Sequence, residues 1–306
     1  MKRFWPTFLG IATFIAGEMI PSCTEPIDLT NDGMKPKLVV TCILTDTLIE
    51  ENIHRVVSEN RVVLQRTTPF FGGEFVVSIA DAKVWINGEL LPMMSPGLYA
   101  QADFCAIPGE TYTLEIYYDM NGDGIEEYYT ATTIVPQKCR LDSVALVPLM
   151  VHGDYYAFLN LYFPGSAGEN YFGAKLNNEG DEKVFSTRIL RYSLFQFDVF
   201  SKEEEYQSLM ADWFISKEMS YDNETKYYLY AGDTLSVTLE SLSKEYHRFI
   251  EVAKIELSPH TPLFSGPRSD VPSNITGGAL GIFGSYTASR ATVVLPQEGL
   301  PKRAER

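Results

Sequence analysis

The residues best suited to chemistry in this chain form a short acidic loop, Asp119-Met120-Asn121-Gly122-Asp123-Gly124. Side-chain oxygens at positions one, three and five, with glycine at position six, are typical of loops that hold Ca²⁺, a hard cation that prefers several oxygen ligands. Position twelve is Thr130, which cannot supply the usual bidentate carboxylate, so Glu127, or alternatively Glu126, would have to supply the last ligand. The sequence predicts a structural calcium site made by Asp119, Asn121, Asp123 and Glu127, and no other cofactor.

The same loop has a second interpretation as an acidic turn without a metal. Asn-Gly and Asp-Gly pairs favour tight turns, because both residue types tolerate a positive φ. The flanking segments, 111–117 and 128–135, alternate like two antiparallel strands rather than like the two helices that surround most loops of this kind. Both interpretations place the loop at the tip of a hairpin.

A second chemically important residue is Cys23. Lys2 and Arg3 precede a short apolar segment, 4–17, which is the order of a secretory signal peptide. The next residues, Ile20-Pro21-Ser22-Cys23, resemble a bacterial lipobox, in which the cysteine becomes the lipidated first residue of the mature protein. We therefore predict a signal peptide over 1–22 and a lipid anchor at Cys23. A plain signal peptide with an incidental cysteine, and an uncleaved membrane helix, are the alternatives.

The charge of the chain limits which partners it is expected to bind. The chain carries 40 acidic and 25 basic residues, a net charge of −15, and removal of 1–22 makes it one unit more negative. Such a body repels phosphate backbones, so nucleic acid is not an expected partner. The outer membrane, reached through the lipid anchor, is the expected one, and the sequence does not say on which face.

Catalytic motifs are not found. The four histidines lack the spacing of metal-ligand pairs, and neither H-E-x-x-H nor G-x-S-x-G occurs. Cys42, Cys105 and Cys139 form no C-x-x-C pair, and free thiols are their simplest interpretation, although their disulfide state stays open. We predict no catalytic residue and no enzyme. A Ser-His-Asp site assembled from distant residues leaves no pattern, so a hydrolase stays an alternative.

The elements that would position these residues are mainly strands. Residues 23–36 are rich in polar residues and in proline and glycine, which interrupt regular structure, and this composition predicts a tether. Residues 37–137 show short strands separated by turn signals such as Asn87-Gly88, which predicts a β-sandwich of the immunoglobulin or transthyretin type. Residues 138–302 predict a second β-rich domain with one amphipathic helix near 243–257, capped by Ser243. A second short helix is predicted over 202–214.

Several segments together resemble one known family. They are the lipobox, Lys-Leu-Val-Val at 37–40, Pro-Gly-Glu-Thr-Tyr-Thr-Leu at 108–114, Leu-Ser-Val-Thr-Leu-Glu-Ser-Leu-Ser-Lys-Glu-Tyr at 235–246 and Ser-Asn-Ile-Thr-Gly-Gly-Ala-Leu-Gly-Ile-Phe-Gly-Ser-Tyr at 273–286. The pattern is similar to an uncharacterised lipoprotein family of Bacteroidota, domain of unknown function 4249. The resemblance implies an accessory or ligand-binding subunit of a TonB-dependent uptake system, with a β-barrel receptor as partner. It transfers no catalytic residue. A surface adhesin or structural matrix lipoprotein is the alternative function.

In that last segment, Asn274, Gly277, Gly278, Gly281 and Gly284 are expected to serve turns and close packing, because glycine permits a positive φ and close approach of the backbone.

Overall fold

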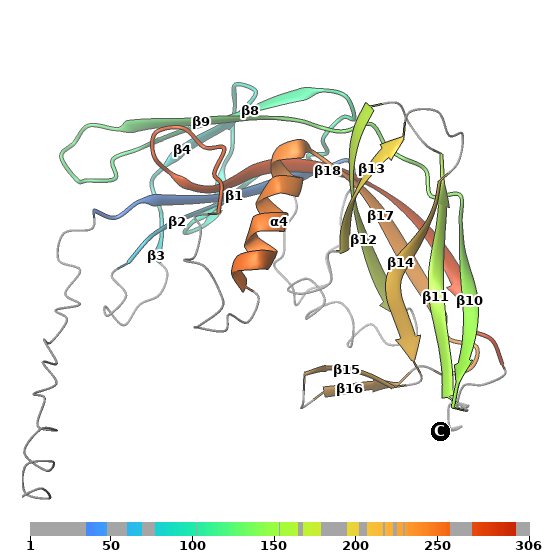
Figure 1. The fold of residues 1–306 in the computed structure, drawn as a ribbon. Coiled ribbons are helices and arrows are strands. Elements are labelled where there is room, and N and C mark those ends of the chain that lie inside the picture. The colour runs from blue at the N-terminus through green and yellow to red at the C-terminus, as the bar shows by residue number, and fades with distance from the viewer. Residues whose placement is uncertain are drawn as a thin grey trace, which may run out of the picture. The chain divides into compact units, whose positions relative to one another are not determined.

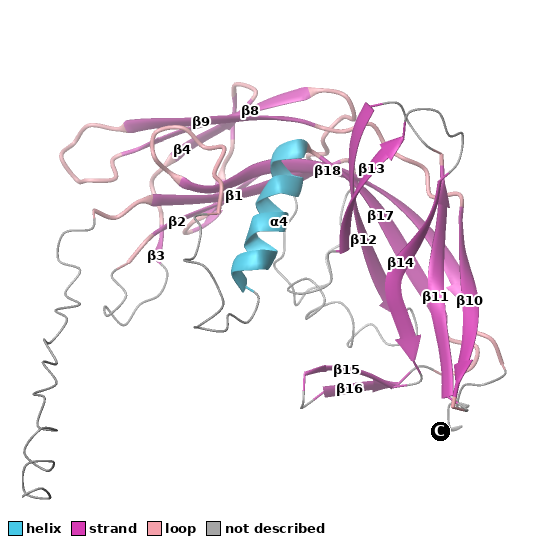
Figure 2. Ribbon diagram, viewed as in Figure 1, coloured by secondary structure: helices cyan, strands magenta, loops and turns pink. Residues whose placement is uncertain are grey.

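The computed structural model describes residues 35–47, 60–68, 77–101, 103–152, 154–164, 168–178, 195–201, 207–216, 218–222, 225–228, 230–257 and 271–297. Residues 1–34 and 35–306 are separate units, and all that follows concerns the second. The predicted signal peptide, Cys23 and nearly all of the tether lie outside the described residues. Figure 2 shows strands throughout and one described helix, which confirms the mainly β fold class.

Two facing sheets build the first sandwich (Figure 1). One is the four-stranded sheet in the order β5-β4-β8-β9. The other runs β1-β2-β7-β6, with β3 beside β2. Their bounds are β1 Leu38–Thr45, β2 Arg61–Arg66, β3 Val77–Ser78, β4 Lys83–Ile86, β5 Glu89–Leu90, β6 Met93–Ser95, β7 Leu98–Ala100, β8 Thr111–Tyr118 and β9 Glu127–Ile134. The Asn87-Gly88 turn joins β4 to β5 with positive φ at both residues, as predicted.

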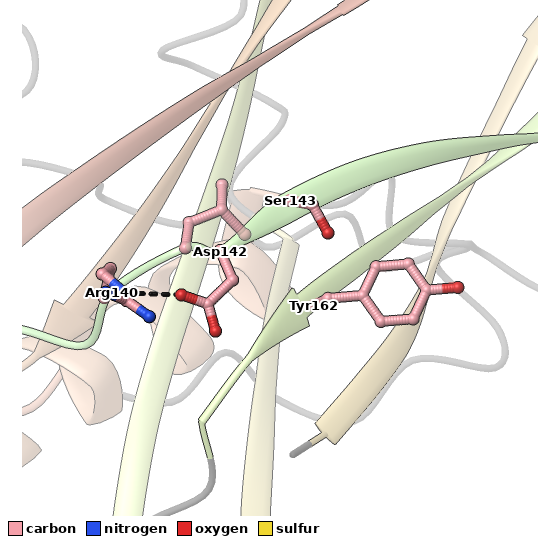
Figure 3. A pocket seen from close by; sticks show the side chains of 5 residues that line it. Arg140, Asp142, Ser143 and Tyr162 are labelled. Carbon is pink, nitrogen blue, oxygen red and sulfur yellow. Dashed lines mark hydrogen bonds and ion pairs between the residues drawn. The ribbon is translucent and has the colours of Figure 1, made fainter.

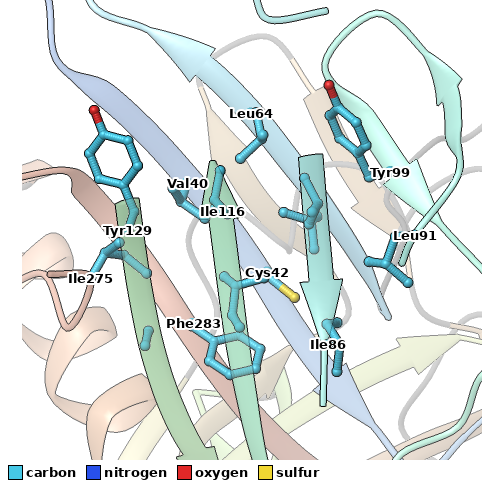
Figure 4. Packing of buried hydrophobic residues seen from close by; sticks show 14 of the residues in the cluster. Val40, Cys42, Leu64, Ile86, Leu91, Tyr99, Ile116, Tyr129, Ile275 and Phe283 are labelled. Carbon is cyan, nitrogen blue, oxygen red and sulfur yellow. The ribbon is translucent and has the colours of Figure 1, made fainter. Parts of the chain in front are cut away.

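The core of this sandwich lies between the two sheets (Figure 4). Inward positions alternate along each strand, because successive strand side chains point to opposite faces. Cys42 on β1 and Ile116 on β8 meet there, and neither is more than 1% exposed. Ile275 and Phe283, from the far end of the chain, belong to the same core. The sandwich is therefore completed by residues that lie more than a hundred positions beyond its other strands.

A second pair of sheets follows. β12, β17 and the second half of β18 face the three-stranded sheet β10-β11-β14 across a core that includes Phe163, Phe172 and Leu239. A small separate hairpin joins β15 to β16. The bounds are β10 Ser143–Val151, β11 Asp154–Phe163, β12 Gly168–Asn178, β13 Phe195–Ser201, β14 Gln207–Ser216, β15 Glu218–Asp222, β16 Thr225–Tyr228, β17 Thr234–Leu242 and β18 Leu280–Val294.

The long strand β18 belongs to both halves. Its residues 280–286 pair in parallel with β1, and its residues 286–294 pair antiparallel with β17. A nine-stranded sheet therefore runs continuously through both cores. The predicted division at residue 137 stays a prediction, but a cut there would separate β18 from the first core that it completes.

The predicted helix is present as α4, Lys244–Leu257. The hydroxyl oxygen of Ser243 accepts a hydrogen bond from the amide of Tyr246 at 3.4 Å, as expected of an N-cap. Tyr246, Phe249 and Ile250 pack with Leu242 at the end of β17 and with Tyr286 on β18. Within the described residues, no helix has the length and apolar character needed to cross a membrane.

The prediction of a second helix over 202–214 is wrong for residues 207–214, while residues 202–206 lie outside the described residues. Residues 207–216 form strand β14, which pairs with β11 from Tyr156 to Phe163. Leu209, Met210 and Ala211 favour helix locally, but pairing with a neighbouring strand outweighs an intrinsic preference of a few tenths of a kcal/mol per residue.

Candidate functional site

The predicted calcium loop forms the turn between β8 and β9. One carboxylate oxygen of Asp119 accepts hydrogen bonds from the amides of Gly122 at 2.7 Å and Asp123 at 3.2 Å. Its other oxygen accepts from the amide of Gly124 at 2.8 Å. Asp119 therefore organises the turn by gathering three backbone donors.

The other predicted ligands bond to the same turn. Asn121 accepts from the amide of Asp123 at 3.0 Å, and Asp123 accepts from the amide of Ile125 at 2.8 Å. Glu127, at the start of β9, reaches back and accepts from the amide of Met120 at 2.7 Å and from the side-chain amide of Asn121 at 2.9 Å. The four residues are thus brought together around one turn.

The geometry of the loop explains its sequence without a metal. Each of the four side chains accepts at least one donor from the loop itself, as Asx-type turns do. Among the residues described here, no three His, Cys, Asp or Glu side chains converge as a possible metal site. Glu126, the alternative ligand, pairs instead with Lys83 on β4 at 2.9 Å. Calcium at this loop stays a prediction.

The three remaining cysteines are free thiols. Burial raises the pKa of Cys42, which sits in the first core. Burial, with the charge of Asp142 adding to it, raises the pKa of Cys139 to about 11. A thiol that stays protonated at neutral pH is a poor nucleophile and a poor metal ligand. Neither position has the electrostatics of a catalytic cysteine.

An open hollow of about 600 Å³ lies where β10 begins and β11 ends, and Figure 3 shows its lining. Arg140, Asp142, Ser143 and Tyr162 surround it, and the Arg140 guanidinium donates to the Asp142 carboxylate. Because the Arg140 side chain is 76% exposed, this ion pair is a surface pair that contributes at most about 1 kcal/mol. The hollow offers a paired charge and two hydroxyl groups, with no base held against Ser143.

A smaller cavity of about 300 Å³ lies beside it, lined in part by Cys139, Tyr171 and Phe172. Tyr171 also packs on the ring of the buried His247, with ring centres 4.7 Å apart, and the His247 imidazole faces the Glu251 carboxylate at 3.5 Å. These contacts hold α4 to the sheet.

The segment 273–286 contains the start of β18 and contacts β9. The side-chain amide of Asn274 donates to the carbonyl of Phe283 at 2.7 Å and accepts from its amide at 2.9 Å, so it pairs like a strand. Thr276 bonds the edge of β9 at Thr130, with its amide donating to the Thr130 carbonyl at 2.8 Å. The segment therefore closes one open side of the first sandwich.

The glycines of this segment behave as the sequence predicts. A side chain at Gly281 would overlap the Val40 carbonyl oxygen, and one at Gly284 would lie 2.7 Å from the Tyr246 β-carbon. Gly277 and Gly278 have φ values of 76° and 78°. The segment is a structural one, and none of its residues lines either cavity.

Sequence reasoning missed one group of residues. Trp85, Tyr117 and Tyr128 lie on three neighbouring strands, and the Tyr117 ring contacts each of the other two on the outward face of the four-stranded sheet. The sequence shows that these aromatic residues alternate with the inward residues Val84 and Ile116, which indicates an outward position. It does not show the strand register that brings the three aromatic residues together.

Comparison with protein families finds a match over most of the chain. The model of the family described as "Domain of unknown function (DUF4249)" matches residues 24–292. A comparison with curated proteins finds no match.

Proposed function

Because the chain belongs to the family of unknown function DUF4249, we propose its role from its anchor and its surfaces rather than from an assigned activity. The proposed role is that of a lipoprotein of the bacterial outer membrane, attached through Cys23. There it would act as an accessory or ligand-binding subunit of a TonB-dependent uptake system. This proposal includes the Bacteroidota origin that the sequence resemblance implies.

The main support for this proposal is the position at which the family match begins. It starts at residue 24, directly after Cys23, and the unit that contains all described residues starts at Lys35. This is the order expected of a lipidated cysteine, a linker and a folded body. Residues 23–36 could span at most about 50 Å when extended, at roughly 3.5 Å per residue. Acyl chains at Cys23 would supply stable membrane attachment, because more than one chain is needed for it.

The folded body suits a binding subunit. Two cores share one continuous sheet through β18, so the outward faces of the sheets and their loops are held on a single framework. Binding residues act best when rigid elements position them. A partner β-barrel would meet such surfaces.

The test has two parts. Gentle detergent extraction of native outer membranes, followed by pull-down and mass spectrometry, should recover a TonB-dependent receptor in stoichiometric amount. The Cys23→Ala variant should lose acylation and leave the membrane fraction. Cys42→Ala, which changes a cysteine within the first core, is the matched control and should remain membrane-attached if it folds.

Three outcomes would count against the proposal. Recovery of the protein alone would remove the uptake role. Recovery with fibre components would favour the adhesin alternative. If Cys23→Ala keeps its acyl chains and its membrane location, the anchor itself is wrong.

A further inference from the structure

The outward face of the four-stranded sheet carries a continuous apolar row. Leu90 on β5 pairs with Trp85 on β4, and Tyr117 on β8 pairs with Tyr128 on β9. The row therefore crosses all four strands, and at about 4.8 Å between neighbouring strands it extends over roughly 14 Å. Because Val84 and Ile116 point to the core, the row side chains must point outward.

The row is open to solvent at both ends. Leu90 is 61% exposed and Tyr128 is 44% exposed. Cross-strand aromatic contacts stabilise a sheet, and the Tyr117–Tyr128 pair, with ring centres 4.8 Å apart, does so here. That stabilisation does not require exposure of large apolar side chains, whereas a contiguous exposed patch is typical of a binding surface.

The rings do not share one plane. Trp85 and Tyr117 meet edge to face, 5.3 Å apart with 83° between their planes, and Tyr117 and Tyr128 are tilted by 45°. A single rigid flat ligand could stack on only one of them. A chain of small linked rings, which can turn at each linkage, could contact them in succession.

Polar groups accompany the row. Glu115 lies opposite Trp85 and accepts a hydrogen bond from the Tyr128 hydroxyl at 2.9 Å. Thr113 pairs with Thr132 on the same outward face, two residues along β8 from Glu115. A carboxylate and hydroxyl groups beside aromatic rings suit a ligand that has both apolar faces and hydroxyl edges.

Charge selects against anionic ligands. Lys83, opposite Tyr117, is already paired with Glu126 at 2.9 Å. The chain as a whole carries −15, so an acidic polymer would be repelled. A neutral ligand meets no such barrier.

We propose that the row Leu90, Trp85, Tyr117 and Tyr128 binds a neutral oligosaccharide chain. The C–H faces of its sugar rings stack on the aromatic side chains, as apolar groups do on rings of this kind, and its hydroxyl groups bond Glu115 and the threonines. This proposal stands on the sheet face alone and does not depend on the uptake role.

The test is native electrophoresis of the folded protein through gels that contain β-glucan, xylan or galactomannan, with a polysaccharide-free gel as reference. At least one polysaccharide should retard the protein. Trp85→Ala should weaken that retardation at least tenfold in apparent affinity, and Tyr128→Ala should also weaken it. Ile134→Ala, a 60% exposed apolar residue on the same face and the same strand as Tyr128, is the matched control and should change it less than twofold.

Circular dichroism of each variant shows whether it folds, and Tyr128→Ala keeps the test valid if Trp85→Ala does not. The proposal is overturned if no polysaccharide retards the protein, or if both row variants bind as the parent does. It is also overturned if the row variants lose a co-purifying receptor and keep their polysaccharide binding, because the row is then a protein interface. Loss of receptor recovery in the unmutated protein would affect only the uptake role.

Discussion

Two glycine-containing segments, 119–127 and 273–286, use the same residue type for different purposes. At Gly124 the backbone has a φ of 84°, and an added side chain would meet nothing within 4 Å. At Gly281 φ is 106°, and an added side chain would overlap the carbonyl of Val40 on the neighbouring strand. The first glycine serves a local turn, while the second lets two distant parts of the chain approach. A positive φ alone therefore does not reveal how much of the fold depends on a glycine.

The largest expected effect is the difference in stability between the variants Gly281→Ala and Gly124→Ala. We expect Gly281→Ala to lower the free energy of unfolding by more than about 4 kcal/mol, or to prevent folding, because it adds a clash with β1 to the backbone strain. Gly124→Ala carries the strain alone and should cost about 1–2 kcal/mol. Urea unfolding followed by circular dichroism measures both. Equal losses for the two variants would show that β18 does not need close contact with β1.

Gly284→Ala separates packing from backbone strain. Gly284 has no positive φ, but an added β-carbon would lie 2.7 Å from that of Tyr246 on α4. Overpacking of this kind costs about 1–3 kcal/mol, because the helix must shift away from the sheet. The same urea experiment gives the value. An unchanged midpoint would mean that α4 moves freely over β18.

Asn274→Asp tests the hydrogen bonds of the closing segment with little change in shape. The aspartate keeps the acceptor for the Phe283 amide and loses the donor for the partly buried Phe283 carbonyl and, more weakly, for the exposed Thr132 carbonyl. Leaving one partly buried acceptor unpaired costs about 1–3 kcal/mol. Thr132→Ser, on the neighbouring edge strand β9, is the control and should change the urea midpoint little. Stability equal to that of the parent protein would show that the Asn274 pairing is dispensable.

Local patterns predicted local structure well. The Asn87-Gly88 turn, the Ser243 cap and the apolar face of α4 each depend on residues close together in the sequence, and all are present. The hairpin around Asp119 also follows from neighbouring residues.

What the sequence could not supply was long-range pairing. The parallel contact of β18 with β1 joins residues about 240 positions apart, from Val39 with Leu280 to Thr45 with Tyr286. The helix predicted over 202–214 failed for the same reason, since β14 exists only because β11 lies beside it. The aromatic row likewise depends on register between strands. The residues of segment 273–286 were expected to serve turns and close packing, but the pairing of this segment with β1 and its hydrogen bond to β9 are not visible in the sequence.

The smallest expected effect concerns calcium at the other segment. If loop 119–127 holds Ca²⁺, 2 mM CaCl₂ should raise the melting temperature of the protein by a few degrees relative to EGTA, since a ligand bound only by the folded state stabilises it. Asp123→Asn is the informative variant, because its side-chain oxygen can still accept from the Ile125 amide while the charge on a predicted ligand is lost. We expect it to keep the stability measured in EGTA and to lose the response to calcium.

Asp233→Asn, in a turn of the second half, is the charge-matched control and should respond to calcium as the parent does. A parent protein indifferent to calcium would establish the loop as a hydrogen-bonded turn, in which Asp119 and Glu127 serve the backbone alone, and would leave the two glycine segments differing only in what surrounds them.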